Sequence, residues 1–131
     1  MKNHNFHRVI LFGSGLIAAG FGAVILFSPT ALYASSGIEM VWNVSLLNEI
    51  RAAGGGLLGC GLFIMAGTFI SRFTYTATII AVLMYLSYGL SRLFSMSVDG
   101  MPVESLVMAM GMELLIGLLC IYLLTRNKII K

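Results

Sequence analysis

The sequence predicts an all-α membrane protein: four transmembrane helices in an antiparallel bundle, with both termini in the cytoplasm. Of its 131 residues, 59% are hydrophobic and only 10% are charged, whereas soluble domains contain about 25% charged residues. The mean hydropathy is +0.97. Four apolar runs also reach the roughly 20 residues that a helix needs to cross a bilayer. The remaining segments are too short to fold alone, so we expect one domain, 1–131.

The four predicted helices cover residues 9–27, 46–70, 75–94 and 103–124. Each run is continuously apolar, whereas the strands of a membrane barrel alternate between apolar and polar residues in pieces of about ten. A helix also satisfies its own backbone in lipid, which favours helices here. The first run follows basic residues, as in a signal peptide, but it is longer than the roughly 7–15 residues of a signal core. We therefore expect it to be a retained helix.

The second helix opens with the stretch NEIRAAGGGLLG, in which two charges precede three glycines. Gly55 and Gly59 form a GxxxG pair, which lets another helix approach closely. The first helix offers a matching face of small residues that includes Gly15 and Ala19. We expect these two helices to pack through the two faces, and we expect Gly117 to allow a close contact on the fourth helix.

Positive charge sets the expected orientation. Six of the eight basic residues lie in the N-terminus, in the loop between the second and third helices, or in the C-terminus. These six are Lys2, Arg8, Arg72, Arg126, Lys128 and Lys131. Cytoplasmic segments carry an excess of Lys and Arg, so we place both termini in the cytoplasm and the protein across the plasma (inner) membrane. The net charge of +3 serves this topology, and no basic patch with interleaved aromatics indicates a nucleic-acid partner.

The spacing of the arginines predicts the depth of the other charges. Arg51 lies 21 residues before Arg72, and Arg92 lies 20 residues after it. In a helix each spacing is about 30 Å, which matches the hydrocarbon thickness of a bilayer. Arg51 and Arg92 should therefore lie level at the outer boundary. Counting back from Arg126 places Glu113 about 10 Å below that boundary. A carboxylate at this depth is costly and usually turns inward to a partner, and the flexible side chain of either Arg51 or Arg92 is long enough to reach it.

Helical phase gathers these groups on inward faces. Glu113 shares its face of the fourth helix with small residues such as Ala109 and Cys120, which are typical of helix contacts. Tyrosines and an arginine likewise share one face of the third helix. The residues that we expect to bind a ligand are Asn48, Glu49, Arg51, Tyr85, Tyr88, Arg92 and Glu113.

Three stretches of the sequence are distinctive: NEIRAAGGGLLGCGLF in the second helix, GLSRLFSMSVDGMP at the end of the third, and MELLIGLL in the fourth. In this order they resemble a widespread bacterial family of small four-helix integral membrane proteins that is catalogued as a domain of unknown function. The resemblance covers nearly the whole chain. It implies the four-helix fold and recurring polar positions at Asn48, Glu49, Arg51, Arg92 and Glu113, and it implies no established activity.

Each polar group also has a structural interpretation. A buried Arg–Glu pair can fix the packing of helices while adding little stability. Glu49 near the start of the second helix suits the positive end of the helix dipole. We expect no metal, cofactor or catalytic residue, because His4 and His7 lie in the polar N-terminus and because Cys60 and Cys120 are small hydrophobic fillers inside helices.

The favoured functional hypothesis is a non-catalytic binding protein. Its outward-facing pocket, between the second, third and fourth helices, holds an amphiphile such as a lipid or quinone, or a partner transmembrane helix. One alternative is a small proton-coupled transporter or channel subunit that uses Glu113, and another is an enzyme that acts on lipid head groups. The expected partners are membrane lipid, an amphiphilic small molecule or a partner membrane protein, and further copies of the chain in a homo-oligomer.

Overall fold

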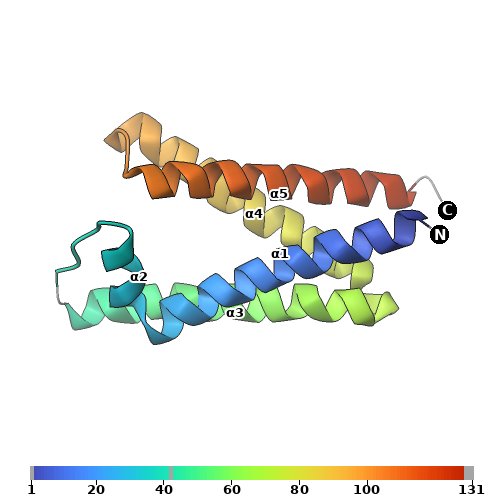
Figure 1. Ribbon diagram of the computed structural model, residues 1–131, viewed down its shortest axis with the longest axis horizontal. Coiled ribbons are helices and arrows are strands. Elements are labelled where there is room, and N and C mark those ends of the chain that lie inside the picture. Colours follow the sequence, from blue (N-terminus) through green and yellow to red (C-terminus); the bar gives the residue numbers. More distant parts are fainter. Residues whose placement is uncertain (1, 42, 129–131) are drawn as a thin grey trace.

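The computed structural model describes residues 2–41 and 43–128, and these residues are mostly helical (Figure 1). The helices are α1 (Lys2–Phe27), α2 (Pro29–Ser35), α3 (Val44–Phe69), α4 (Ser71–Asp99) and α5 (Glu104–Lys128). No strand occurs in these two ranges. Four of the helices, α1, α3, α4 and α5, are long and apolar enough to cross a membrane. The all-α prediction with four membrane-length helices is therefore confirmed.

The long helices extend beyond the apolar runs that predicted them. The α1 helix begins at Lys2 rather than near residue 9, and α4 ends at Asp99 rather than near residue 94. Hydropathy finds only the part of a helix that suits hydrocarbon, whereas backbone hydrogen bonds continue into the polar flanks. The α4 helix then stops at Gly100, whose φ of +97° is open to glycine but strained for other residues.

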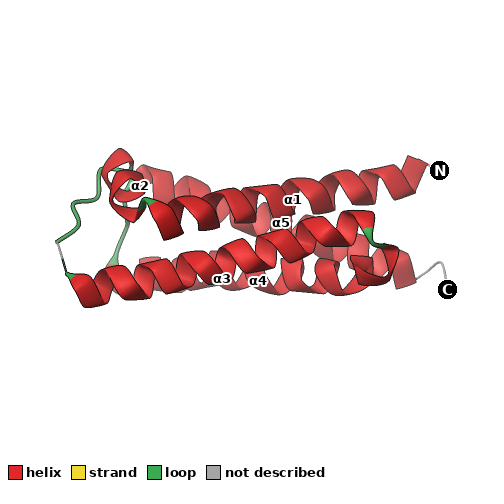
Figure 2. Ribbon diagram, turned by 90° about the horizontal axis from the view of Figure 1, so that it is seen from below, coloured by secondary structure: helices red, strands yellow, loops and turns green. Residues whose placement is uncertain are grey.

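The short helix α2 was not predicted. It covers only seven residues, and Pro29 occupies its first turn, where proline costs no hydrogen bond. Figure 2 shows that α2 and the loops that precede α3 and α5 gather at the end opposite the labelled termini. The N and C labels lie together at the other end of the molecule.

The four long helices are organised as two pairs. The α1 helix packs mainly against α3, and α4 packs mainly against α5. The pairs lie close together at the end that carries the termini and diverge toward the end that carries α2 (Figure 1). This divergence leaves room between the pairs, and the candidate site lies there.

The contact between α1 and α3 depends on glycines. A Cβ atom built on Gly22 would lie 2.3 Å from the backbone nitrogen of Leu58, and one built on Gly61 would lie 2.3 Å from that of Ala19. Gly15 and Gly54 have similarly close neighbours on the opposite helix. Such contacts let two backbones approach closely in lipid. The two helices are in contact, and Gly15 and Ala19 lie in the contact on the α1 side.

The predicted face of α3 was wrong. A Cβ atom on Gly55 or Gly59 would meet nothing within 4 Å, so neither residue lies in a helix contact. Gly54 and Gly61 face α1 instead, about 100° around the helix from the predicted face. The run of glycines at positions 54–56 offers several small faces, and the GxxxG pattern alone does not show which of them meets a partner.

A second glycine contact joins α4 to α5. A Cβ atom on Gly89 of α4 would lie 2.6 Å from the Leu114 side chain, and one on Gly117 of α5 would lie 2.5 Å from the Leu86 side chain. Each glycine therefore makes room for a leucine of the partner helix. The predicted role of Gly117 in a helix contact is confirmed.

The hydrophobic core lies where the two pairs meet. Leu11 of α1, Ile64 of α3, and Ala77 and Ala81 of α4 are fully buried there. Gly67 of α3 lies so close to Ala77 that an added Cβ atom would stand 2.3 Å from the alanine side chain. This dense contact holds the two pairs together on the side of the divergence that is nearer the chain termini.

The glycine contacts make a prediction about stability. Replacing Gly61 with alanine should lower the free energy of unfolding by about 1–3 kcal/mol, because the new methyl group overlaps the α1 backbone and forces the helices apart. Replacing Gly59 with alanine is the matched control, and it should be neutral or raise stability by up to about 1 kcal/mol through helix propensity. Unfolding in mixed detergent micelles measures both. Equal effects of the two substitutions would contradict the assigned contact.

Candidate functional site

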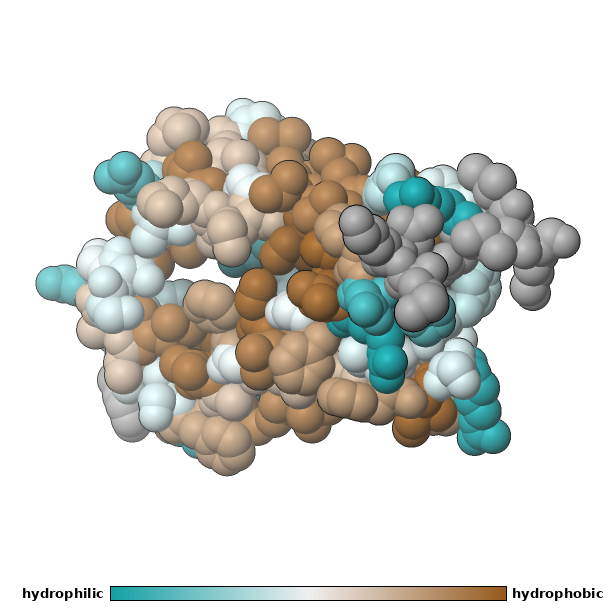
Figure 3. All heavy atoms as spheres, turned by 45° about the vertical axis from the view of Figure 1, so that its right-hand side comes forward, coloured by the Kyte–Doolittle hydropathy of each residue, from teal (hydrophilic) through white to brown (hydrophobic). Residues whose placement is uncertain are grey.

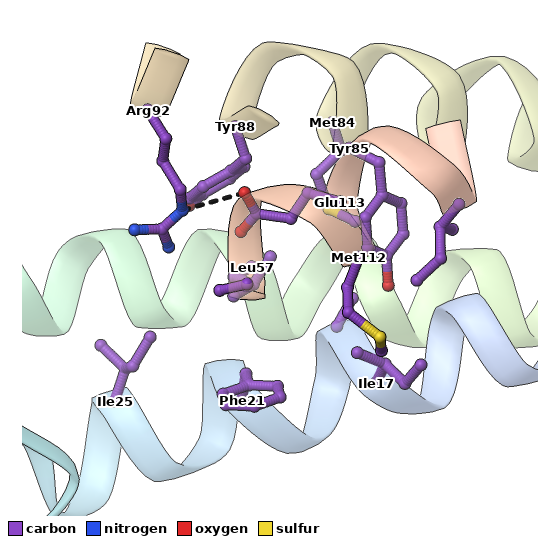
Figure 4. Close-up of a pocket in the computed structure, with 13 residues that line it drawn as sticks. Ile17, Phe21, Ile25, Leu57, Met84, Tyr85, Tyr88, Arg92, Met112 and Glu113 are labelled. Carbon is purple, nitrogen blue, oxygen red and sulfur yellow. Dashed lines mark hydrogen bonds and ion pairs between the residues drawn. The ribbon is translucent and has the colours of Figure 1, made fainter. Parts of the chain in front are cut away.

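A cavity of about 180 Å³ lies between the two pairs of helices, where they begin to diverge. Figure 3 shows a hollow between the pairs, bordered largely by hydrophobic side chains. The cavity is lined by four residues of α1, one of α3, four of α4 and four of α5 (Figure 4). They are Ile17, Ala18, Phe21 and Ile25; Leu57; Met84, Tyr85, Tyr88 and Arg92; and Ala109, Met112, Glu113 and Ile116.

An ion pair forms part of the wall. The Nε of Arg92 on α4 donates to Oε2 of Glu113 on α5 at 2.9 Å, and the two side chains are 31% and 16% exposed. The prediction that Glu113 turns inward to an arginine is confirmed, and the partner is Arg92. The physical reason is that α4 packs directly against α5, whereas α3, which carries Arg51, packs against α1 and α4.

The two tyrosines of α4 occupy different positions. Tyr85 is 5% exposed, and its hydroxyl donates to the backbone carbonyl of Ser14 on α1. This hydrogen bond joins the two pairs of helices at the floor of the cavity. Tyr88 lies one turn further toward the open end, beside Arg92, and is 37% exposed. Tyr85 therefore closes the cavity, whereas Tyr88 forms its wall.

Asn48, Glu49 and Arg51 do not reach the cavity. All three are exposed, and the residue that caps α3 is Asn43, whose side chain accepts from the backbone N–H of Leu46 at 3.1 Å. The expected pocket between the second, third and fourth long helices is thus corrected. The first long helix supplies four lining residues, and α3 supplies only one.

The end of α1 explains this correction. Gly54 contacts Ile25 and Leu26, close to the last residue of α1, Phe27. Residues 48–51 lie about one to two turns beyond that contact, so they extend past α1 and past the cavity. The depth of Arg51 along its helix does not decide whether it lines the pocket. The pocket wall depends on which helix faces the pair formed by α4 and α5.

A second polar cluster lies nearer the termini and was missed. His7 of α1 is 8% exposed, and its Nε2 lies 3.0 Å from the hydroxyl of Thr78 on α4. The Thr78 hydroxyl donates its proton to the carbonyl of Thr74, so it accepts from a protonated Nε2 of His7. Nearby, Nε of Arg8 donates to the carbonyl of Thr68 on α3. The cluster therefore ties the start of α1 to α3 and α4.

A repeat of seven residues connects these polar contacts. On α4, Thr78, Tyr85 and Arg92 follow one another at this spacing, and their partners on α1, His7 and Ser14, are also seven apart. Two helical turns separate successive members, so they lie on one face. This signal was present in the sequence, but treating His7 as part of a polar tail concealed it. Leu11 is fully buried on α1 between His7 and Ser14, so it separates the His7–Thr78 contact from the Ser14–Tyr85 contact.

Among the residues described, no group of three or more His, Cys, Asp or Glu side chains is placed to hold a metal ion. The cavity contributes one carboxylate, one guanidinium and two phenols to an otherwise apolar lining. Such a lining suits a molecule that is mostly apolar and carries a small hydrogen-bonding group.

Comparison with known families agrees with this architecture. The family described as a domain of unknown function (DUF4345) matches residues 6–124. The chain belongs to this family. The match covers α3 and α4 in full, most of α1 and α5, and every cavity-lining residue named above in this DUF4345 member. No curated protein and no solved structure matches the chain.

The ion pair makes a prediction about coupling. Replacing either Arg92 or Glu113 with leucine should destabilise the protein more than replacing both, because a single change leaves one partly buried charge without its partner. The coupling energy should be about 1–3 kcal/mol in a double-mutant cycle of detergent unfolding. The exposed Ser95–Asp99 hydrogen bond of α4 is the control, and its cycle should give a value near zero. Additive effects at Arg92 and Glu113 would show that the pair does not form.

Proposed function

We propose that this DUF4345 protein is a non-catalytic integral membrane protein that binds an amphiphile in the cavity between its helix pairs. The observation that carries the proposal is the composition of the cavity: apolar side chains from all four long helices surround a single ion pair. A ligand there places its apolar part against α1 and α5 and its polar group near Arg92.

The size of the cavity suits one chain segment or one ring. An apolar cavity of about 150 Å³ in a protein core is large enough to take up benzene, and this cavity has about 180 Å³. It is too small to enclose a whole diacyl lipid. An occupant therefore inserts one chain or a ring, while the rest of the molecule remains in the surrounding bilayer.

The cavity is open to the region that lipid would occupy. Phe21 and Met112 line it, yet they are 54% and 53% exposed, respectively. Side chains that are partly inside and partly outside mark an opening in the wall. Since such an opening between transmembrane helices faces hydrocarbon, ligands of the bilayer have direct access, which favours an amphiphile over a water-soluble solute.

The proposed orientation follows from charge. The cationic residues Arg8, Arg72 and Arg126 lie near the ends of helices, and the chain termini share one end of the molecule. The excess of basic residues supports our proposal that this end faces the cytoplasm at a plasma (inner) membrane. In this arrangement the four long helices form an antiparallel bundle, and the diverging end with the cavity opens toward the outer leaflet.

Cysteine labelling tests the orientation. In a variant without Cys60 and Cys120, new cysteines at Ser35 or Ser97 should react with a membrane-impermeant maleimide in intact cells. A cysteine at Ser71, in the connection between α3 and α4, should react only after the membrane is permeabilised. The reverse pattern would place the cavity in the cytoplasmic leaflet.

Blocking the cavity tests the binding function. Replacing Ala109 with phenylalanine should fill the space and reduce photo-crosslinking of a diazirine-labelled acyl chain to the cavity at least fivefold, because the ring occupies the volume of the ligand. Met108 is 66% exposed and does not line the cavity, so Met108→Phe should leave crosslinking unchanged. Mass spectrometry of crosslinked peptides locates the probe. Unchanged labelling of Ala109→Phe would reject the proposed site, and recovery of a bound transmembrane protein instead would identify a partner helix as the occupant.

A further inference from the structure

We infer that the cavity selects amphiphiles with an uncharged hydrogen-bonding head group, such as a carbonyl, over otherwise identical amphiphiles with an anionic head group. The inference rests on the proposed function and concerns the chemistry of the same site. It follows from the unused hydrogen-bonding groups of the ion pair and from the charge balance of the cavity.

The ion pair leaves several donors available. A guanidinium carries five N–H donors, and Arg92 uses Nε for Glu113. Within residues 2–41 and 43–128, no acceptor bonds to its two terminal amino groups. Figure 4 shows these groups on the side of the guanidinium that faces away from Glu113, the same side of the view on which Ile25 is drawn. They can therefore donate to a ligand without breaking the bond to Glu113.

Acceptors lie beside these donors. The Arg92 bond uses Oε2 of Glu113, which leaves Oε1 for another donor. The Tyr88 hydroxyl lies in the same wall and can donate or accept. A carbonyl oxygen on a ligand would satisfy the guanidinium, and a ligand hydroxyl would satisfy Glu113. The site thus matches a head group that hydrogen-bonds without carrying charge.

The charge balance disfavours an anion. Among the described residues, Arg92 and Glu113 are the only charged ones in the lining, and their charges cancel. An anionic head group on the free edge of Arg92 would be attracted by the guanidinium and repelled by the carboxylate behind it. It would also lose its hydration and leave one net negative charge in a medium of low dielectric constant, which is costly. A neutral carbonyl gains the hydrogen bonds and avoids both costs.

The cavity volume further restricts the class of ligands that can bind. About 180 Å³ admits one chain or ring with a small head group, and it excludes a bulky sugar. The carbonyl can belong to an ester, as in a monoacylglycerol, or to a quinone ring. These two sources present the same acceptor to Arg92, so the experiment needs a probe for each.

The test compares two ligands that differ by one phosphate group and therefore in charge. Wild-type protein in mild detergent is labelled with the photoactivatable acyl probe, and monooleoylglycerol or monooleoyl lysophosphatidic acid competes for the site. The uncharged glycerol lipid should compete at least tenfold more strongly than its phosphorylated counterpart. Decylubiquinone is the second arm: stronger competition by it than by the glycerol lipid assigns the carbonyl to a ring, and weaker competition assigns it to an ester.

A charge variant sharpens the test. Glu113→Gln removes the repelling carboxylate and leaves Arg92 with an uncompensated charge, so the preference should reverse by at least tenfold in favour of the phosphorylated lipid. Glu104→Gln removes an exposed acid at the start of α5, outside the cavity, and it should retain the wild-type preference. The double variant Arg92→Gln with Glu113→Gln carries no charge in the cavity and should also prefer the neutral lipid. It provides a second measurement if Glu113→Gln alone does not fold.

The outcomes separate the two proposals. Equal or stronger competition by the phosphorylated lipid in wild-type protein would overturn the inference about charge while leaving an amphiphile site in place. Absence of saturable labelling in wild-type protein, with no effect of Ala109→Phe, would overturn the proposed function itself. Retention of the neutral preference in Glu113→Gln would show that the carboxylate does not set selectivity.

Discussion

Helices surrounded by lipid gain little from hiding apolar side chains, because the acyl chains around them are equally apolar. Steric fit must therefore hold this protein together. The α1–α3 contact, in which Gly22 meets Leu58 and Gly61 meets Ala19, supplies that fit for one pair of helices, and the glycine–leucine contacts supply it for the other. Because each pair is closely packed within itself, the space between the pairs remains as the cavity.

Polar contacts, in contrast, determine how the two pairs of helices are positioned against each other. The Tyr85–Ser14 and His7–Thr78 hydrogen bonds both cross from one pair of helices to the other, whereas the Arg92–Glu113 pair lies within the α4–α5 pair. His7 and Tyr85 are both buried, so these contacts specify how the pairs meet. The ion pair adds no link between the pairs, which leaves its unused donors and acceptors facing the cavity.

The sequence predicted those features that the bilayer dictates. Four apolar runs require four helices, and a carboxylate inside an apolar run, such as Glu113, requires a partner, so both followed from residue types and spacing. Features that depend on the rotation of one helix against another did not follow. The GGG run of α3 left the choice between Gly54 and Gly55 open, and the contribution of α1 to the cavity depends on that choice. His7 was misplaced because hydropathy marks where hydrocarbon begins rather than where the helix begins.

The Tyr85–Ser14 contact sets the geometry of the space above it. From Tyr85 to Asp99, α4 continues for 14 residues, about 21 Å at 1.5 Å per residue. A rigid arm of that length converts each degree of rotation at its base into roughly 0.4 Å of movement at its tip. A small change at the contact between the Tyr85 phenol and the Ser14 carbonyl would therefore be magnified at the open end of the α4–α5 pair.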